Sequence, residues 1–436
     1  DVYKRQLLMN NDLSSYFEDP EFKEALEKYE GMVKNHTPAY FDADELTDIA
    51  EYYASKGRQI EAEAAIDFAL QLHPNDTDAL IFRARSLAMK GRLDEAYMVM
   101  DLIEDRSDRE VRFLKADLLM EEKRMEEADH VFEELAAYEE GKLETLIDII
   151  LAYIDANQEA LAKKWIKHVG ETYDLASLSQ KSQKFRDLLC DFYITFNNPE
   201  AAIPLLQATL DCYPYSINHW NSLGKCYLST NDYEEAHEAI DFALAIDDSN
   251  AEALTLKAFC YQQSGELQKS CDYYLRLAEQ QENKTRAYLA LAKTYFEMQD
   301  YTSSIYYIEA LLDNKDALSK YELSELYGDI ALCHAALKHI GVGQASIRRS
   351  LELNENDPDT LIVAGRFFLM EAKACNDETA KAENQAKGEL YFRQALNLIM
   401  EDERLDYLFT IGAACFDTQN FKLAAQYYEQ INREFP

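Results

Sequence analysis

Apolar residues recur along the chain at intervals of three and four, the spacing of one buried helix face, and no segment alternates convincingly with a period of two. Within this pattern, small residues return at an interval of 34. They are Ala50 and Ala84, and then Cys190, Gly224, Ala258 and Ala292. Twelve residues after each comes a second small residue, at Ala62, Ala96, Ala202, Ala236, Ser270 and Ser304. This period predicts an all-α stack of helix pairs, each contacting only its neighbours, instead of one globular core.

The clearest repeat runs from Ile217 to Asn250. Its first helix is predicted to carry on one face Trp220, Leu223, Gly224 and Tyr227. Its second helix carries Tyr233, Ala236, Ile240 and Ala243. The W-x2-L-G-x2-Y spacing, followed by the alanine of the second helix, resembles a tetratricopeptide repeat, here of the bacterial type with many repeats. The resemblance implies a right-handed superhelical solenoid of antiparallel helix pairs, with the first helices lining the concave face.

Aligned on these positions, the chain contains eleven units, and positions are counted from the first residue of each unit. The units start near residues 43, 77, 109, 143, 183, 217, 251, 285, 324, 358 and 405. Units one to four occupy residues 43–176 and units five to eleven residues 183–436. The extra residues between them, 177–182, are interpreted as a hinge between two subarrays.

Residues 1–42 precede the first unit. We interpret residues 1–8 as a non-native remnant, because Met9 starts a sequence typical of a natural N-terminus. A helix is predicted to begin at Asp19-Pro20-Glu21, with proline in its first turn. Its apolar residues at helical spacing are Phe22, Leu26, Tyr29 and Val33. This amphipathic helix is expected to cap the apolar face of the first unit.

Two sets of residues have a structural role in every unit. The small residues at positions 8 and 20 should let the paired helices approach closely, because a larger side chain would overpack the crossing. Position 15 should hold the left-handed turn between the helices, which glycine and asparagine tolerate. The residues predicted for these turns are Gly57, Gly91, Gly265, Asn157, Asn197 and Asn231.

The chain is strongly acidic, with 81 acidic and 44 basic residues and a net charge of −37. A field of this sign repels phosphate backbones and anionic membrane surfaces, so neither nucleic acid nor membrane is expected as a partner. No apolar stretch reaches the length of a membrane-spanning helix. The acidity has two interpretations: it keeps a long array in solution, or it attracts a basic partner.

Most of the cysteines occupy positions where helix packing requires a small residue, and the cysteines do not group into a catalytic or metal site. Cys226, Cys260 and Cys333 share one position in three units, where a small buried residue is wanted, and no Cys/His group has zinc-ligand spacing. Phosphate-loop, HExxH and GxSxG motifs are absent from the sequence. We therefore expect neither an enzyme nor a cofactor or metal site. Free buried thiols favour a reducing compartment, hence a cytoplasmic, bacterial-type location.

Positions 2, 5, 9 and 12 of each unit should be exposed on the concave face. Position 9 carries cations in this acidic chain, at Arg85, Lys225, Lys293 and Arg366, with Phe259 between two of them. Other inward positions hold aromatic residues, namely Phe113, Phe296, Phe409 and Phe416. An aromatic platform flanked by cations suits an extended or helical peptide with a few carboxylates, and residues 217–318 are the favoured groove. The alternative is that the cations form ion pairs within the chain, for example Lys293 with an acidic residue of the next helix.

Some tetratricopeptide proteins hold a C-terminal carboxylate with a lysine–asparagine–arginine clamp. Here Asn221 and Lys225 occupy the two clamp positions in reversed order, and Leu256 and Ala290 follow in the next units, so that ligand is not expected. The sequence thus predicts a non-enzymatic scaffold that binds a protein or peptide in its concave groove. Two alternatives are a regulatory module that changes shape on peptide binding and an enzyme without a recognisable motif. Self-association through the convex face or the last unit is a further possibility.

Overall fold

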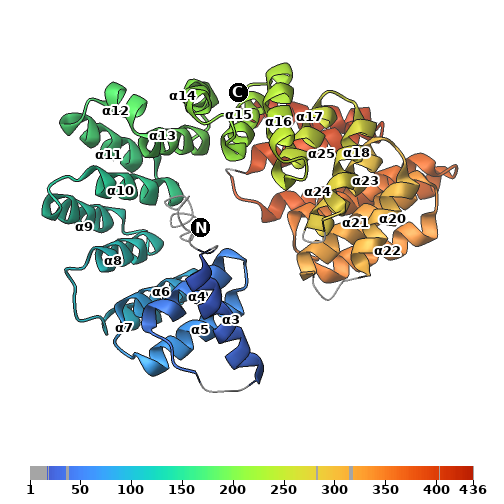
Figure 1. Cartoon of the computed structure of the whole chain (residues 1–436). Coiled ribbons are helices and arrows are strands. Elements are labelled where there is room, and N and C mark those ends of the chain that lie inside the picture. The colour runs from blue at the N-terminus through green and yellow to red at the C-terminus, as the bar shows by residue number, and fades with distance from the viewer. Residues whose placement is uncertain are drawn as a thin grey trace. The chain divides into compact units, whose positions relative to one another are not determined.

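The computed structural model describes residues 17, 19–35, 39–280, 283–313, 318–401 and 403–435. These residues form twenty-four α-helices and no strand, which confirms the predicted all-α class (Figure 1). Residues 1–8, interpreted above as a remnant, lie outside the described residues. The packing divides the chain between Cys212 and Tyr213 into an N-terminal and a C-terminal unit, which are described separately below.

The N-terminal unit contains five helix pairs and two additional helices. In chain order its helices are α3 (Pro20–Asn35), α4 (Ala43–Ser55), α5 (Gln59–Leu72), α6 (Thr77–Met89), α7 (Leu93–Met100), α8 (Arg109–Glu121), α9 (Met125–Tyr138), α10 (Leu143–Asp155), α11 (Glu159–Thr172), α12 (Leu175–Lys181), α13 (Gln183–Thr195) and α14 (Pro199–Cys212). The predicted hinge, residues 177–182, falls on α12 and on Ser182, whose side chain caps α13. A hinge at this place stays a prediction.

The C-terminal unit contains the remaining six pairs. Its helices are α15 (Ile217–Ser229), α16 (Tyr233–Ile246), α17 (Ala251–Gln263), α18 (Leu267–Ala278), α19 (Lys284–Glu297), α20 (Tyr301–Leu312), α21 (Lys320–Ala336), α22 (Ile340–Leu353), α23 (Pro358–Ala374), α24 (Glu378–Leu398), α25 (Arg404–Asp417) and α26 (Phe421–Glu434). Ten of the eleven first helices thus begin within one residue of the predicted unit starts. The exception is α21, which begins at Lys320, four residues before the predicted start.

The predicted N-terminal helix is α3, and it packs on the first pair. Phe22 and Tyr29 are buried in one apolar cluster with residues of α4 and α5, and Leu26 packs against that cluster. Val33, which the helical spacing placed with them, is instead 53% exposed near the end of α3. The prediction for Val33 was wrong because Met32, the preceding residue, packs against the cluster in the last turn of α3 instead.

The small residues lie where the paired helices cross. Position 8 is buried in every unit, and Ala50, Ala84 and Ala258 have no exposed surface. In the α19–α20 pair the two small positions touch directly, because Ser304 Oγ donates a hydrogen bond of 2.8 Å to the carbonyl oxygen of Ala292. A Cβ at Gly224 would lie 2.7 Å from Ile240 on the facing helix. This contact confirms that close approach requires a minimal side chain.

The turns between paired helices adopt the predicted left-handed conformation. All six predicted residues have φ between 52° and 77°: they are Gly57, Gly91, Gly265, Asn157, Asn197 and Asn231. Four further pairs place a longer side chain in the same conformation, at Lys123, Gln299, Lys338 and Gln419. The turn therefore requires the left-handed conformation whichever residue occupies it. Glycine or asparagine only lowers the free-energy cost of adopting that conformation.

Two glycines of the N-terminal unit should respond oppositely to alanine. Gly57 has φ of 73°, and no atom lies within 4 Å of the position that a Cβ would take, so alanine there adds only backbone strain, which lowers stability by about 1 kcal/mol. Gly31 also has open space around it but lies inside α3, where alanine is expected to raise stability by about 0.5–1 kcal/mol. Urea unfolding of the two variants measures both signs. A loss of stability in both variants would contradict this account of the turn.

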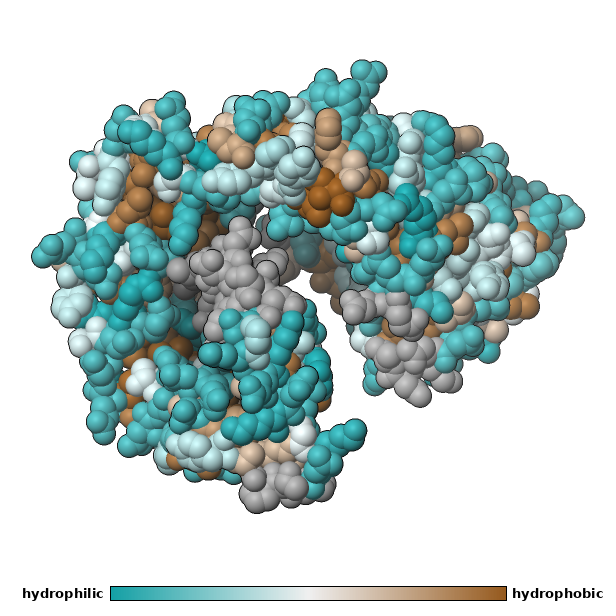
Figure 2. Space-filling view, in the orientation of Figure 1, coloured by the Kyte–Doolittle hydropathy of each residue, from teal (hydrophilic) through white to brown (hydrophobic). Residues whose placement is uncertain are grey.

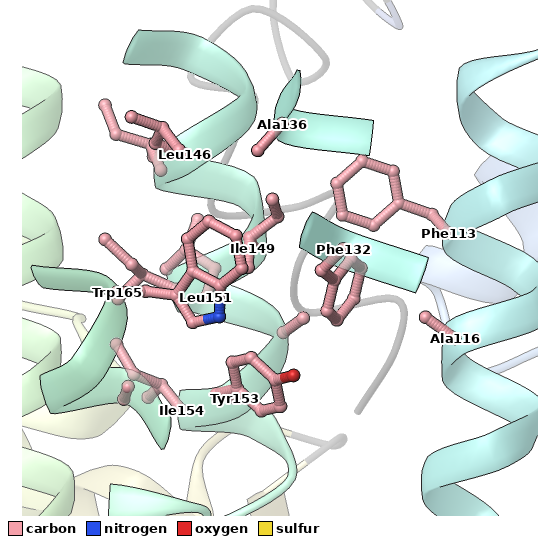
Figure 3. Packing of buried hydrophobic residues seen from close by; sticks show 14 of the residues in the cluster. Phe113, Ala116, Phe132, Ala136, Leu146, Ile149, Leu151, Tyr153, Ile154 and Trp165 are labelled. Atoms are coloured by element: carbon pink, nitrogen blue, oxygen red, sulfur yellow. The ribbon is translucent and has the colours of Figure 1, made fainter. Parts of the chain in front are cut away.

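The core is a series of clusters between successive helices. In the largest cluster Phe113, Phe132, Tyr153 and Trp165 come from α8, α9, α10 and α11 (Figure 3). Polar side chains cover most of the visible surface of each unit (Figure 2), in keeping with the strongly acidic composition. First helices of successive pairs also contact one another, as α21 does with α23, and they form one face of each unit.

Candidate functional site

The four cations at position 9 are paired within the chain. Each contacts a carboxylate on the first helix of the next pair. The pairs are Arg85 with Glu110 (3.4 Å) and Asp117 (3.7 Å), Lys225 with Glu252, Lys293 with Glu325 (3.6 Å), and Arg366 with Asp417 (3.3 Å). Intramolecular pairing, the alternative left open by the sequence, is therefore present at all four positions. Because the pairs of Lys225 and Lys293 are well exposed, each contributes only about 0–1 kcal/mol and could exchange with a ligand.

The predicted aromatic residues divide into exposed and buried ones. Phe259, Phe409 and Phe416 are 41%, 49% and 57% exposed, respectively. Phe296 is partly buried and packs on Tyr301, with a ring-centroid distance of 5.4 Å. Phe113 is a correction to the predicted groove: it is only 3% exposed.

Phe113 is buried like most residues at position 5 of the units, and its neighbours hold its ring in the core. Its ring packs on Phe132 with a centroid distance of 5.3 Å, and the guanidinium of Arg109 lies 5.0 Å from its centroid. The side chain therefore belongs to the core of the N-terminal unit and is not available to a ligand. Arg85 lies in the same unit, whereas the other seven predicted groove residues belong to the C-terminal unit.

Asn221, the asparagine of the reversed clamp, has a structural role. It is 1% exposed and donates hydrogen bonds to Asn250 Oδ1 (3.1 Å) and Glu252 Oε2 (3.0 Å). Its amide group is thus committed to joining α15 to the start of α17. These bonds leave no amide donor for a ligand carboxylate.

A pocket of about 520 Å³ lies on the first helices of the C-terminal unit. Its lining comes mainly from α21, α23 and α25, and we call it the α21–α25 pocket. Leu332, Arg366 and Ala413 hold position 9 of their units, so the pocket lies on the face where the sequence predicted a groove. It lies outside the favoured block 217–318. A second cavity of about 570 Å³ is lined by residues of α22 and α24, among them Arg348, Tyr391 and Gln394.

The α21–α25 pocket is acidic with an apolar floor. Its charged lining residues are the carboxylates of Glu325, Asp329, Asp357, Asp359 and Asp417 and the guanidinium of Arg366. The apolar lining is formed by Leu332, Ile362, Val363, Ala413 and Ala414. Burial, followed by the charge of Asp357, raises the pKa of Asp359. A pocket of this composition repels anions and favours a cation.

Asp329 is the ionisable residue whose pKa is most affected here. It lies in the middle of α21 and is partly exposed to the pocket. Burial raises its pKa to about 6, and the charge of Glu325 acts in the same direction, whereas Lys293 and Arg366 lower it. Sequence reasoning missed Asp329 because position 6 was assigned to neither the core nor the concave face. Its signal was an aspartate between apolar turns of a helix, next to Gly328.

The remaining candidates for chemistry among the described residues are metal-ligating groups and cysteine thiols. No group of three or more His, Cys, Asp or Glu side chains in them could hold a metal ion. All eight cysteines are free, and burial raises the pKa of Cys226, Cys260 and Cys333 to about 11, which makes these thiols unreactive. Among the described helices, none combines the length and apolar character needed to cross a membrane.

Comparison with known proteins agrees with the repeat architecture. A family model described as tetratricopeptide repeat matches residues 47–97 and 221–285. The formate-dependent nitrite reductase complex subunit NrfG of Escherichia coli O157:H7 is 26% identical over 191 residues, which are 42% of this chain and 89% of that protein.

Two solved structures are also similar. A tetratricopeptide repeat protein from Parabacteroides merdae ATCC 43184 is 15% identical, covers 62% of this chain and 98% of its own, and has a TM-score of 0.45. The pilF protein of Pseudomonas aeruginosa is 18% identical, covers 50% of this chain and 92% of its own, and has a TM-score of 0.35. Residues 47–97 and 221–285, which the family model matches, contain the helix pairs, small crossing residues and left-handed turns described above, and on these grounds the chain contains tetratricopeptide repeats.

Proposed function

We propose that this protein is a non-enzymatic scaffold that binds a segment of another protein on the first helices of its C-terminal unit. The observation that supports it best is the α21–α25 pocket, in which side chains of three first helices surround a space of about 520 Å³. Tetratricopeptide repeats typically mediate protein–protein interactions, and the relative NrfG is by its name a subunit of a complex. The proposed surface extends along the position-9 residues Lys225, Phe259 and Lys293.

The charge supports a protein partner over a nucleic acid or a membrane. A net charge of −37 opposes binding to phosphate-rich surfaces, and a cytoplasmic location is proposed from the free, buried thiols. Self-association through the last helix has less support. The exposed face of α26 is mainly polar, with Gln426, Glu429 and Arg433, and Phe421 is an exposed apolar residue only at its start.

A pair of matched variants tests the proposal by capture from the native cell extract. Ala413→Leu narrows the α21–α25 pocket, whereas Ala425→Leu makes the same change on the exposed face of α26. Capture of the partner, identified by mass spectrometry with the wild-type protein, is expected to fall at least about tenfold for Ala413→Leu only, the size of effect that blocking a well-packed contact produces. Equal capture by both variants would contradict the proposed surface.

The extended surface has its own test. The double variant Phe259→Ala/Lys225→Glu should weaken capture of the same partner while the helical circular dichroism stays unchanged. The reason is that Phe259 is exposed and Lys225 forms only an exposed ion pair, so neither residue contributes much to the fold. Unchanged capture by this variant would limit the binding surface to the α21–α25 pocket.

The regulatory alternative is favoured by the division of the chain into two compact units. A module that closes on its partner should become more compact on binding. Small-angle scattering with and without the captured partner measures this, and unchanged dimensions of the chain would contradict the regulatory function.

A further inference from the structure

Among the carboxylates of the α21–α25 pocket, Asp329 differs in having no partner. Glu325 pairs with Lys293, and Asp417 pairs with Arg366. Asp357 caps α23 by accepting a hydrogen bond of 2.8 Å from the backbone N–H of Thr360. By contrast, Asp329 accepts no hydrogen bond and forms no ion pair within the part of the chain that the structure describes. The cations that act on it, Lys293 and Arg366, already pair with Glu325 and Asp417, so its ionised form has no counter-charge of its own.

The neighbourhood of Asp329 makes this arrangement unfavourable for the fold alone. A Cβ at the adjacent Gly328 would lie 2.9 Å from Val363 Cγ1, so α21 and α23 are in close contact beside the carboxylate. With a pKa of about 6, Asp329 is ionised at neutral pH although it is poorly hydrated. Groups that lower stability in a pocket are commonly found where a ligand is bound.

The shape and the lining of the pocket indicate the kind of ligand that would compensate Asp329. Leu332, Ile362 and Val363 offer an apolar surface, while the acidic groups surround it. Lysine and arginine side chains combine a methylene stem, which packs on apolar surface, with a cationic head. A carboxylate-bearing peptide, as predicted from the position-9 cations, would meet five carboxylates here. Charge complementarity therefore selects a basic side chain.

We propose that the α21–α25 pocket binds one lysine or arginine side chain from an extended segment of the partner protein, with the cationic head on the carboxylate of Asp329. The proposal rests on the scaffold function proposed above and specifies the chemistry of its partner. It also gives the acidic composition a role at one defined place.

The test uses labelled nonapeptides of glycine, serine and alanine with a single central lysine or, as an uncharged control, norleucine. Fluorescence anisotropy with the full chain at low salt measures the ratio of the two affinities, and an arginine peptide shows which basic side chain is preferred. The wild-type protein should bind the lysine peptide at least about tenfold more tightly than the norleucine peptide, as expected for a charge-assisted contact in a partly desolvated pocket. Equal affinity for the two peptides would overturn the proposal.

Two variants with the same change of net charge separate the pocket from the general field of the protein. Asp329→Asn should reduce the lysine preference to less than about twofold, because an amide does not balance the cation. Glu429→Gln, on the exposed face of α26, should leave the preference unchanged. If both variants reduce it equally, the peptide responds to overall charge and the pocket assignment is wrong.

The pH dependence provides a second readout. The charged groups that face Asp329 are Glu325 on its own helix, Lys293 on α19 and Arg366 on α23. Because its pKa is about 6, the lysine preference of the wild-type protein should decline as the pH falls from 7.5 to 5, while Asp329→Asn shows no such decline. Asp329→Asn should also raise the thermal midpoint at pH 8, because it removes an uncompensated charge. A raised midpoint would show that the variant is folded and that its loss of binding is not caused by unfolding. A pH-independent preference would overturn the role of Asp329.

The outcomes distinguish this inference from the scaffold function. If Ala413→Leu abolishes partner capture but the lysine peptide shows no preference, the scaffold function stands and the basic ligand is wrong. If Ala413→Leu leaves capture unchanged and the lysine preference is present, the pocket binds basic side chains but does not hold the captured partner.

Discussion

Replacement of Gly365 by alanine is expected to destabilise the C-terminal unit by about 3 kcal/mol, at the upper end of the cost of overpacking a core. A Cβ at Gly365 would lie 2.6 Å from Phe392 Cδ1 and 3.0 Å from its Cζ. The ring cannot move aside easily, because Phe392 has no exposed surface and packs edge-on against Tyr427. The backbones are also close, since a Cβ at Gly388 would lie 3.0 Å from the carbonyl oxygen of Gly365.

Urea unfolding, followed by circular dichroism, measures this loss of stability. The thermal midpoint of Gly365→Ala should also fall, by about 5–10 °C. Gly341→Ala in α22 is the matched control, because nothing lies within 4 Å of a Cβ at that exposed glycine. Alanine there should leave stability unchanged or raise it by up to about 1 kcal/mol. Equal stability of Gly365→Ala and Gly341→Ala would contradict the close crossing of α23 and α24.

The second large effect is expected in the N-terminal unit, from Asp129→Ala. Asp129 on α9 accepts hydrogen bonds from Tyr153 Oη (2.9 Å) on α10 and from Trp165 Nε1 (2.8 Å) on α11, and it pairs with Lys164. Tyr153 and Trp165 are almost fully buried, so alanine leaves two buried donors without an acceptor. At about 1–3 kcal/mol for each unsatisfied donor, the free energy of unfolding should fall by roughly 3 kcal/mol.

Two variants show which interaction matters. Asp129→Asn keeps one acceptor oxygen and should cost clearly less than alanine. Glu133→Ala removes only the other, exposed partner of Lys164 (2.6 Å) and should change stability by less than about 0.5 kcal/mol. If Glu133→Ala costs as much as Asp129→Ala, the ion pair with Lys164 and not the buried donors stabilises this cluster.

The effect of Asp129→Ala should depend on pH. Burial alone raises the pKa of Asp129, but hydrogen bonds from Lys164, Trp165 and Tyr153 outweigh it and hold the pKa below its ordinary value. A carboxyl group with a lowered folded-state pKa stabilises the protein fully above its unfolded pKa of about 3.9 and loses this contribution as the pH falls through the folded value. The difference between wild type and variant should therefore be constant from pH 6 to 8 and shrink below about pH 4.

The fold could be predicted because every unit repeats the same local requirements. Small residues such as Gly224 mark the crossing, and Asn231 marks the turn, so a period of 34 places each helix. The structure departs from the predicted helix boundaries where a unit does not follow the period of 34. The helix α21 starts at Lys320 because Ser319 caps it, accepting a hydrogen bond from the backbone N–H of Glu322 while Glu322 bonds back to Ser319. That capping box lies in the extra residues before the ninth unit.

The candidate site could be predicted only in part. Register placed Arg366 and Lys293 on the predicted concave face, but it could not show that each pairs with an acidic residue on the first helix of the next pair. Phe113 was misassigned because position 5, expected on the concave face, is buried in most units, as at Ile81, Ile147 and Ile362. Asp329 was missed because the α21–α25 pocket depends on small residues of different helices, such as Gly328 and Ala413, whose proximity no single-helix pattern reveals.

Site-specific photo-crosslinking tests most directly whether the first helices of the C-terminal unit bind a partner. A small diazirine amino acid is placed at Thr410 on the α21–α25 pocket, at Gln394 on the second cavity, or at Gln426 on the exposed face of α26. We predict that one protein crosslinks from Thr410 but not from the other two positions, through a segment that carries a lysine or an arginine next to the crosslinked residue. Crosslinks to that protein from Gln394 or Gln426 instead would contradict the account.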